Sequence, residues 1–179
     1  IIMIREDSLQ LESDAFRPFP ETTNILEWCE QKFGIAPSVF DGYRFWSRPS
    51  SDKVWVADIR CRPEMGGLCE AIGVLGLRGF PPRSKPTSVF LQQFAKKANR
   101  NVYCISPADA LRFLRRETID IVPVDDGNGY CVVRTETHVL GCGRVRGRQL
   151  VSEVPGDWAR AFERPIARFA GRQQTQVVE

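Results

Sequence analysis

The sequence contains a single histidine, and its six cysteines include no Cys-X-X-Cys pair. A structural zinc site needs several such ligands at close spacing, and His138 lies near only Cys142 in the chain. Most of the cysteines stand in apolar stretches, as small buried thiols do in proteins of a reducing compartment. We therefore expect no zinc, no disulfide and a cytoplasmic location.

Long apolar segments are also absent. No apolar run approaches the ~20 residues that a transmembrane helix requires. The apolar stretch at residues 1–4 is too short for a secretory signal and has no basic flank. We expect no signal peptide and no membrane partner.

Motifs of catalysis and cofactor binding are missing as well. No GxGxxG or Walker A motif follows a predicted strand, and no GxSxG motif occurs. A histidine-based triad could form only at His138, where no serine or cysteine is placed to complete it. Cys142, four strand residues further on, would lie about 13 Å away. We expect a protein that is not an enzyme, with no cofactor and no metal.

Acidic residues are unevenly distributed, although the formal net charge is only +3. Residues 1–30 hold seven acids against two arginines, whereas residues 71–108 hold six basic residues and no acid. Residues 144–172 hold seven arginines against three acids. Such asymmetry indicates a localised positive face, and the commonest partner of such a face is a polyanion.

The composition, 42% hydrophobic and 26% charged, is that of a folded protein. Helical and strand-like patterns both occur, so the expected fold class is α+β. Helices are predicted at residues 24–33, 88–99 and 107–116, the first starting at Asn24 and ending at Gly34, the third burying Ala110, Leu111 and Leu114. Strands are predicted at residues 43–48, 53–59, 101–105, 118–124, 130–135, 139–145 and 149–154. Residues 72–77 fit either a helix or a strand.

The last five of these strands are expected to form one curved sheet or barrel. Residues 118–124 should lie beside residues 130–135, because the strongest turn signal in the chain joins them. The next breaks, at residues 136–137 and 146–147, suit tight hairpins.

A change in composition near Arg100 predicts a boundary between two units that pack as one body. We expect an irregular acidic arm at residues 1–21, an α+β unit at 22–99, a β-rich unit with a C-terminal helix at 100–172, and a frayed tail at 173–179. The C-terminal helix should be kinked at Pro165. It carries arginines at four-residue steps: Arg160, Arg164, Arg168 and Arg172.

Three arginines follow one another in the last predicted hairpin. Arg144, Arg146 and Arg148 alternate along the chain, so in extended backbone they all project from one face. The sequence LGCG at residues 140–143 places glycines inside a strand, which marks a bulge or a close approach of backbone or ligand. The hairpin is either a binding surface or a solvated sheet edge.

Four segments, in this order, resemble a known family: KPTSVFLQQF at residues 85–94, the helix at 106–116, GYCVV at 129–133 and LGCGRV at 140–145. Over residues 33–155 the chain resembles RNA-binding proteins with a PUA domain behind a pre-PUA α/β unit. Two kinds of relative share this pattern. They are the small ribosome-biogenesis factor of archaea and eukaryotes, and the C-terminal PUA-like region of Sun/RsmF-type RNA cytosine-5 methyltransferases.

The resemblance implies a pre-PUA-like α/β unit packed against a small, partly open, PUA-like mixed β-barrel that docks on structured RNA, either rRNA or tRNA. The sequence shows neither the cofactor-binding glycine loop nor the proline–cysteine motif of the Sun-type methyltransferase half. The resemblance therefore implies a non-catalytic RNA-binding protein, acting in ribosome biogenesis or as an RNA-targeting module. Its implied protein partner is an RNA methyltransferase or a ribosome-assembly protein.

The alternative is a protein-interaction or regulatory subunit whose basic face binds an acidic partner. A hydrolase or transferase built on a PUA-like barrel would need motifs that the sequence lacks.

The RNA surface is expected at the junction of the two units. The arginines of the hairpin are distant in sequence from the acid-free run, and their convergence would form one positive face. The predicted RNA-binding residues are Arg144, Arg146, Arg148, Lys85, Lys96, Lys97, Arg100 and Arg83.

Overall fold

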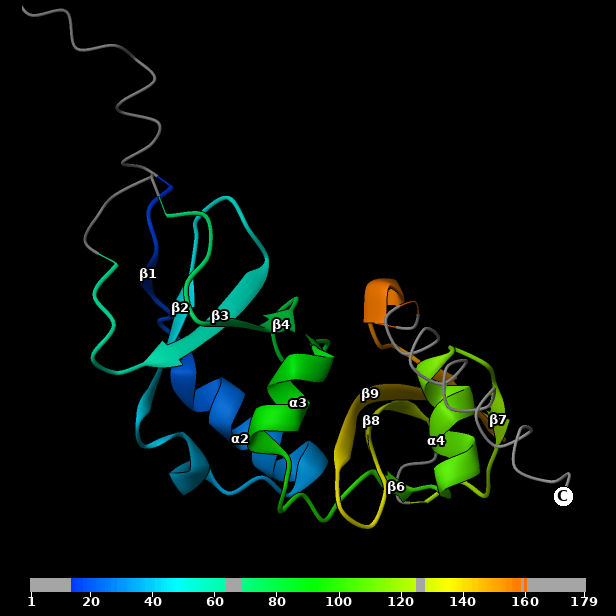
Figure 1. Ribbon diagram of the computed structural model, residues 1–179. Coiled ribbons are helices and arrows are strands. Elements are labelled where there is room, and N and C mark those ends of the chain that lie inside the picture. Colours follow the sequence, from blue (N-terminus) through cyan, green and yellow to red (C-terminus); the bar gives the residue numbers. More distant parts are fainter. Residues whose placement is uncertain (1–13, 64–68, 125–127, 159, 161–179) are drawn as a thin grey trace, which may run out of the picture. The chain divides into compact units, whose positions relative to one another are not determined.

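The computed structural model describes residues 14–63, 69–124, 128–158 and 160. The chain divides into two compact units, Ile1–Arg100 and Asn101–Glu179, and each contains a five-stranded sheet and helices (Figure 1). The fold class is therefore α+β, as predicted. Most of the predicted acidic arm, most of the arginine-bearing C-terminal helix and the tail lie outside the described residues, and the predicted domain limits stay predictions. Within the described residues, no helix combines the length and apolarity that crossing a bilayer requires.

The first unit is a sheet in the order β1-β2-β3-β4-β5, in which all neighbouring strands are antiparallel. The strands are β1 (Arg17–Pro18), β2 (Tyr43–Ser47), β3 (Lys53–Asp58), β4 (Val74–Arg78) and β5 (Lys85–Pro86). The helical segments are α2 (Thr22–Phe33), the 3-10 helix η1 (Pro37–Phe40) and α3 (Ser88–Phe94). The predicted hairpin of β2 and β3 is confirmed, and the undecided residues 72–77 contribute to strand β4.

Helix α2 begins earlier than predicted but ends where predicted. Its N-cap is Glu21 rather than Asn24, and the Asn24 side-chain amide donates to the Glu21 carboxylate at 3.1 Å. Gly34 follows the last residue with φ +65°, the left-handed conformation that glycine adopts at a helix C-terminus without a steric penalty. The sequence signal at this end is reliable because few other residues fit that conformation.

Strand alternation gives the first sheet two different faces. One face carries Phe45, Val54 and Leu77, which are almost fully buried. Phe40 connects this face to helix α3, since its ring centroid lies 5.5 Å from that of Phe45 and 5.0 Å from that of Phe94 in α3. We refer to it as the helix-covered face.

The opposite face carries two tryptophans, and we refer to it as the tryptophan face. Trp46 of β2 and Trp55 of β3 are direct cross-strand partners and both are buried. Phe16 packs edge-on against Trp55, with ring centroids 4.9 Å apart. The two tryptophans are therefore core residues of the sheet.

Helix α3 begins as predicted. The hydroxyl of Thr87 accepts a hydrogen bond from the Phe90 N–H at 3.2 Å, which makes Thr87 a side-chain N-cap. The helix ends at Phe94, however, and not at residue 99.

The early end of α3 has a visible cause in the backbone that follows it. The N–H groups of Asn99 and Arg100 both donate to the carbonyl of Phe33, the last residue of α2. These bonds fix residues 99–100 against the end of α2, where a continuation of helix α3 would not place them. Lys96 and Lys97, expected in the last helical turn, therefore lie in an exposed turn after the helix.

The second unit is a mixed sheet in the order β6-β8-β9-β10-β7. Its elements are β6 (Val102–Cys104), α4 (Pro107–Leu114), β7 (Ile119–Asp120), β8 (Gly129–Arg134), β9 (Val139–Arg146) and β10 (Gln149–Ser152). Strand β6 runs parallel to β8, and the other neighbours are antiparallel. The five strands predicted for this unit therefore lie in one sheet, as expected.

The position of β7 within the sheet contradicts the prediction. The sequence predicts residues 118–124 beside residues 130–135, but β7 pairs with β10 at the far edge. The reason is that β6 and β9 already occupy both edges of β8. The turn signal at residues 125–129, of which 125–127 lie outside the described residues, thus does not close a hairpin with β8.

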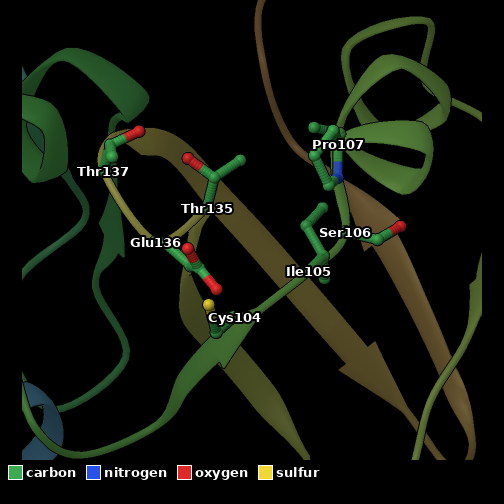
Figure 2. A pocket seen from close by; sticks show the side chains of 8 residues that line it. Cys104, Ile105, Ser106, Pro107, Thr135, Glu136 and Thr137 are labelled. Atoms are coloured by element: carbon green, nitrogen blue, oxygen red, sulfur yellow. The ribbon is translucent and has the colours of Figure 1, made fainter.

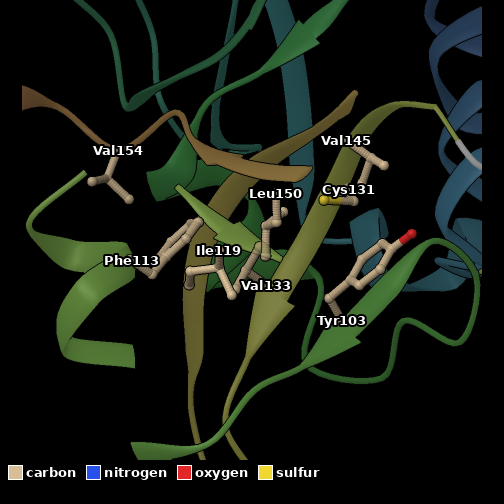
Figure 3. Packing of buried hydrophobic residues seen from close by; sticks show 8 residues of the cluster. All are labelled: Tyr103, Phe113, Ile119, Cys131, Val133, Val145, Leu150 and Val154. Atoms are coloured by element: carbon tan, nitrogen blue, oxygen red, sulfur yellow. The ribbon is translucent and has the colours of Figure 1, made fainter. Parts of the chain in front are cut away.

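The hydrophobic core of the second unit lies against one face of this sheet. In Figure 3 the ring of Phe113 extends from α4 towards Ile119 and Leu150, and all three side chains are buried. The cluster consists of Tyr103, Phe113, Ile119, Cys131, Val133, Val145, Leu150 and Val154.

Helix α4 buries a different stripe from the one predicted. Ala110 and Phe113 are buried, whereas Leu111 is 38% exposed and Leu114 is only partly buried. Ala110 and Phe113 lie three residues apart and so share one helix face. The prediction failed because it placed both leucines on the buried face, whereas the aromatic ring occupies the core.

The two edges of the second sheet are joined by a side chain. Tyr103 belongs to β6 at one edge, and its hydroxyl accepts a hydrogen bond of 2.9 Å from the N–H of Val124, which follows β7 at the other edge. Both edge strands also contribute to the same core. The sheet therefore curls into the partly closed barrel that was expected for this unit.

Candidate functional site

The arginine hairpin consists of β9, the turn Gly147–Arg148 and β10. Gly147 has φ +59°, as the first position of a type II′ hairpin turn requires, and Arg146 pairs with Gln149 across it. Val145 points into the core, so its neighbours Arg144 and Arg146 point outward from β9. The prediction that all three arginines project from one face of extended chain does not hold for Arg148, because that residue lies in the turn between β9 and β10.

The outward arginines differ in their surroundings. The guanidinium of Arg144 lies 5.5 Å from the ring centroid of Tyr130, its direct partner on β8, and such a cation–π contact favours one position of the side chain. Arg146 is exposed and stands in a cross-strand row with Gln149 and Asp120. Asp120 lies two strands away from Arg146, and neighbouring strands are about 4.8 Å apart. The Asp120 carboxylate therefore weakens the positive potential around Arg146 without forming a direct ion pair with it.

The other predicted RNA-binding residues belong to the first unit. Arg83 lies in the loop that joins β4 to β5, and Lys85 begins β5. Lys96, Lys97 and Arg100 follow α3, whose seven residues span about 10 Å. The two groups therefore stand at opposite ends of α3, and their convergence with the arginine hairpin stays a prediction.

A pocket of about 720 Å³ opens in the second unit where helix α4 begins (Figure 2). The connection from β6 to α4 and the turn between β8 and β9 form its walls. Its lining residues are Cys104, Ile105, Ser106, Pro107, Ala110, Thr135, Glu136 and Thr137. The volume falls within the range of small-ligand sites, roughly 300–1,000 Å³.

The hydroxyl groups in this pocket already have partners. Ser106 is the N-cap of α4: its hydroxyl accepts from the Asp109 N–H at 3.1 Å and donates to the Asp109 carboxylate at 2.9 Å. The Thr137 hydroxyl lies 2.7 Å from Nδ1 of His138. Glu136 is exposed, and the described part of the chain offers its carboxylate no hydrogen bond or ion pair.

The lining contains no lysine or arginine, so the pocket suits hydrogen-bond donors rather than phosphate. The pocket also lies apart from the turn of the arginine hairpin. Strand β9 separates the two, and its seven residue steps from Val139 to Arg146 extend about 23 Å. A ligand that used both would have to be several nucleotides long.

The cysteine–histidine pair considered in the sequence does not form a catalytic arrangement. Cys142 is completely buried in β9, whereas His138 lies in the exposed turn and contacts Thr137. A catalytic thiolate must reach its substrate, and a buried thiol cannot.

Sequence reasoning missed the partnership of Tyr130 with Arg144. Counting back from a turn at residues 136–137 places Tyr130 opposite Gly143. The register shifts by one residue at Val133/Arg134, where Gly141 has φ +142°, and this bulge brings Arg144 opposite Tyr130. The pocket was also missed, because it depends on the parallel pairing of β6 with β8, which no local signal reveals.

A small mixed sheet that curls into a partly closed barrel, with a helix after its first strand and a basic hairpin on its outer side, defines a small β-barrel module. Residues 100–160 match the family described as Methyltransferase RsmF PUA domain. The second unit is therefore a PUA domain, and the chain is a PUA-domain protein related to the C-terminal regions of Sun/RsmF-type methyltransferases.

Residues 14–73, in the first unit, match a family of unknown function (DUF7122). A search of curated proteins found no match to the chain.

Proposed function

We propose that this protein binds structured RNA through its PUA domain and performs no catalysis itself. The observation that carries the proposal is the match of residues 100–160 to the PUA domain of the methyltransferase RsmF. PUA domains are RNA-binding accessory modules and not catalytic ones. The finer role is an RNA-targeting module for rRNA or tRNA, acting beside an RNA methyltransferase or in ribosome assembly in the cytoplasm.

The arginine hairpin supports this proposal on chemical grounds. Arg144 and Arg146 point outward from one strand, and Arg148 is exposed in the adjoining turn. Lysine and arginine contacts to phosphates supply most of the affinity of proteins for structured RNA, which they recognise largely by shape. The hairpin is therefore the phosphate-binding part of the proposed interface.

A salt titration tests the proposal. A fluorescein-labelled RNA stem–loop is titrated with the full chain at several salt concentrations, and the logarithm of the affinity is plotted against that of the salt concentration. Each lost phosphate contact flattens the slope by about 0.7–0.9. The double variant Arg144→Gln/Arg146→Gln should flatten it by about two contacts and leave the thermal midpoint nearly unchanged.

The matched control is Arg115→Gln/Arg116→Gln, which removes the same charge from exposed positions after α4 in the same unit. We expect it to bind as the parent does. A parent that binds no stem–loop but binds an acidic protein would support the alternative, a protein-interaction subunit.

A further inference from the structure

The pocket at the start of helix α4 has two walls of different chemistry (Figure 2). The wall formed by the connection from β6 to α4 is mainly apolar, since it contains Ile105, Pro107 and the buried Ala110. The turn between β8 and β9 forms a polar wall from residues 135–137. A flat ligand with an apolar face and polar atoms along one edge therefore fits between the walls.

The start of helix α4 does not make the pocket an anion site. Pro107, the first helical residue, has no N–H, and the N–H of Asp109 donates to the Ser106 hydroxyl at 3.1 Å. The N–H of Ala110 donates to the Ser106 carbonyl at 2.8 Å. The donors that would bind an anion at a helix N-terminus are therefore largely missing or in use. The Asp109 carboxylate adds negative charge to the same turn.

Glu136 brings an unpaired carboxylate to the polar wall. It is the single acid among residues 128–152, which hold four arginines, and within the described chain its carboxylate has no hydrogen bond or ion pair. In Figure 2 it points from the turn towards the end of β6, where Cys104 lies. An ionised carboxylate only accepts hydrogen bonds, and its two oxygens accept from two neighbouring donors at once. The edge of a matching ligand therefore presents two adjacent N–H groups.

We propose that the pocket binds an unpaired guanine base of the RNA, with the Glu136 carboxylate accepting from N1–H and from the N2 amino group. These two donors lie side by side on the Watson–Crick edge of guanine. Adenine and cytosine present one amino group beside a ring nitrogen that the carboxylate repels, and uracil presents one N–H between two carbonyl oxygens. Single-stranded loops offer unstacked bases whose Watson–Crick edges are open to such contacts.

The guanine site rests on the proposed function, because the base belongs to the RNA that the PUA domain binds. The pocket and the arginine hairpin lie at opposite ends of strand β9, whose seven residue steps extend about 23 Å. One RNA of several nucleotides reaches both. The arginines then hold the phosphates of the stem and set its position, whereas the pocket reads one base of the loop and supplies sequence preference.

The test uses the full chain and two fluorescein-labelled RNA stem–loops that differ only in the loop. One loop has about eight nucleotides of alternating guanosine and uridine, within the range of single-strand site sizes, and the other has inosine in place of each guanosine. Inosine keeps N1–H but lacks the N2 amino group. The parent should bind the guanosine loop at least about fivefold more tightly than the inosine loop, the lower end of the discrimination that a bidentate base contact gives.

The variant Glu136→Gln should reduce this ratio of affinities to less than about twofold, because the amide has one acceptor and turns its own N–H group towards the second donor of guanine. The ratio is compared within each variant, so a general change in RNA affinity on loss of the negative charge cancels. The matched control is Glu117→Gln, which removes the same charge from an exposed position of the same unit, outside the pocket. It should keep the ratio of the parent.

Alkylation of Cys104 gives a second measurement that needs no variant. This thiol is exposed and lines the pocket, so a base bound there covers it. The guanosine stem–loop should slow the reaction of Cys104 with iodoacetamide at least about threefold, because only an accessible thiolate reacts. The inosine stem–loop at the same concentration should slow it less. Cys61, a partly exposed thiol of the first unit, is the internal reference and should react at an unchanged rate.

Any of four results overturns the guanine site: the parent binds both loops equally, Glu136→Gln keeps the ratio of the parent, Glu117→Gln loses it, or the bound guanosine stem–loop leaves the alkylation of Cys104 unslowed. The proposed function is tested separately by the arginine hairpin. If Arg144→Gln/Arg146→Gln loses stem–loop binding while the parent does not distinguish the loops, only the guanine site is wrong. If the parent binds neither stem–loop, both proposals are wrong.

Discussion

Each of the two glycines in the LGCG sequence is required for a different structural reason. Gly141 takes φ +142° at the bulge that sets the register of β8 and β9. Gly143 lies where core side chains approach the backbone. A Cβ atom there would stand 2.6 Å from Val133 Cγ2 and 2.7 Å from Leu150 Cδ1. The motif thus builds the barrel wall that presents the arginines.

Replacing Gly143 with alanine should therefore destabilise the PUA domain. Val133 is completely buried and stiff about χ1, so it cannot move aside. We expect a loss of about 1–3 kcal/mol in the free energy of unfolding, as for other overpacked cores. Urea denaturation measures it, with Gly42→Ala as the control, because nothing lies within 4 Å of a Cβ at that position. An equal stability of both variants would contradict the packing described.

The cysteines should differ sharply in reactivity. Burial raises the pKa of the Cys29 thiol to about 12, whereas Cys104 is exposed in the pocket. Iodoacetamide at neutral pH should modify Cys104 first and leave Cys29 unmodified until denaturant is added, as peptide mass spectrometry would show. Equal rates for the two in the folded protein would refute the burial of Cys29.

The same thiol makes folding sensitive to alkaline pH. Its pKa in the folded state, about 12, lies above the ordinary value of 9.0, so its contribution to stability is complete below pH 9 and is lost as the pH rises towards 12. Over that window the free energy of unfolding should fall by up to about 1.4 kcal/mol per pH unit on account of this group. Cys29→Ala should show a shallower decline in urea titrations at pH 9 and 10, and an unchanged decline would contradict this assignment.

At the scale of elements, the chemistry of neighbouring residues was sufficient to predict several helix boundaries. Gly34 ends α2, Thr87 begins α3 and Ser106 begins α4, each by the capping geometry that its residue type predicts. The β2–β3 and β9–β10 hairpins also follow from alternation and short polar breaks. These features depend on residues close together in the chain, so the sequence suffices to predict them.

Features that depend on distant residues could not be predicted. The end of α3 is fixed by bonds to the Phe33 carbonyl, and the place of β7 is fixed by which strand edges are already occupied. The candidate site shows the same division. The outward direction of Arg144 and Arg146 follows from alternation, whereas the contact of Arg144 with Tyr130 requires the register of β8 and β9.

The hydrogen bond that joins the two edges of the second sheet should contribute measurably. Tyr103→Phe removes the acceptor of the Val124 N–H and keeps the ring in the core, so we expect a loss of about 1 kcal/mol. Tyr43→Phe is the matched control, since its hydroxyl accepts only an exposed bond of 3.3 Å from Gln93, and it should change stability by less than about 0.5 kcal/mol. Urea midpoints compare the two, and a Tyr103 variant as stable as the control would show that the edges are not held in this way.

At the scale of the whole molecule, the chain combines a PUA domain with a first unit that matches a family of unknown function. The PUA domain carries its basic surface, the arginine hairpin, on the outer side of its sheet.

The central claim is that the PUA domain binds RNA in the cell, and ultraviolet crosslinking followed by identification of the joined peptides and RNA tests it most directly. We predict a defined structured RNA, rRNA or tRNA, crosslinked to peptides that contain the arginine hairpin. Loss of those crosslinks in the Arg144→Gln/Arg146→Gln variant, at unchanged protein abundance, would complete the result. Recovery of no RNA above background would contradict the account. So would RNA that is crosslinked only to peptides C-terminal to Asp157, which contain the arginines at four-residue steps that begin at Arg160.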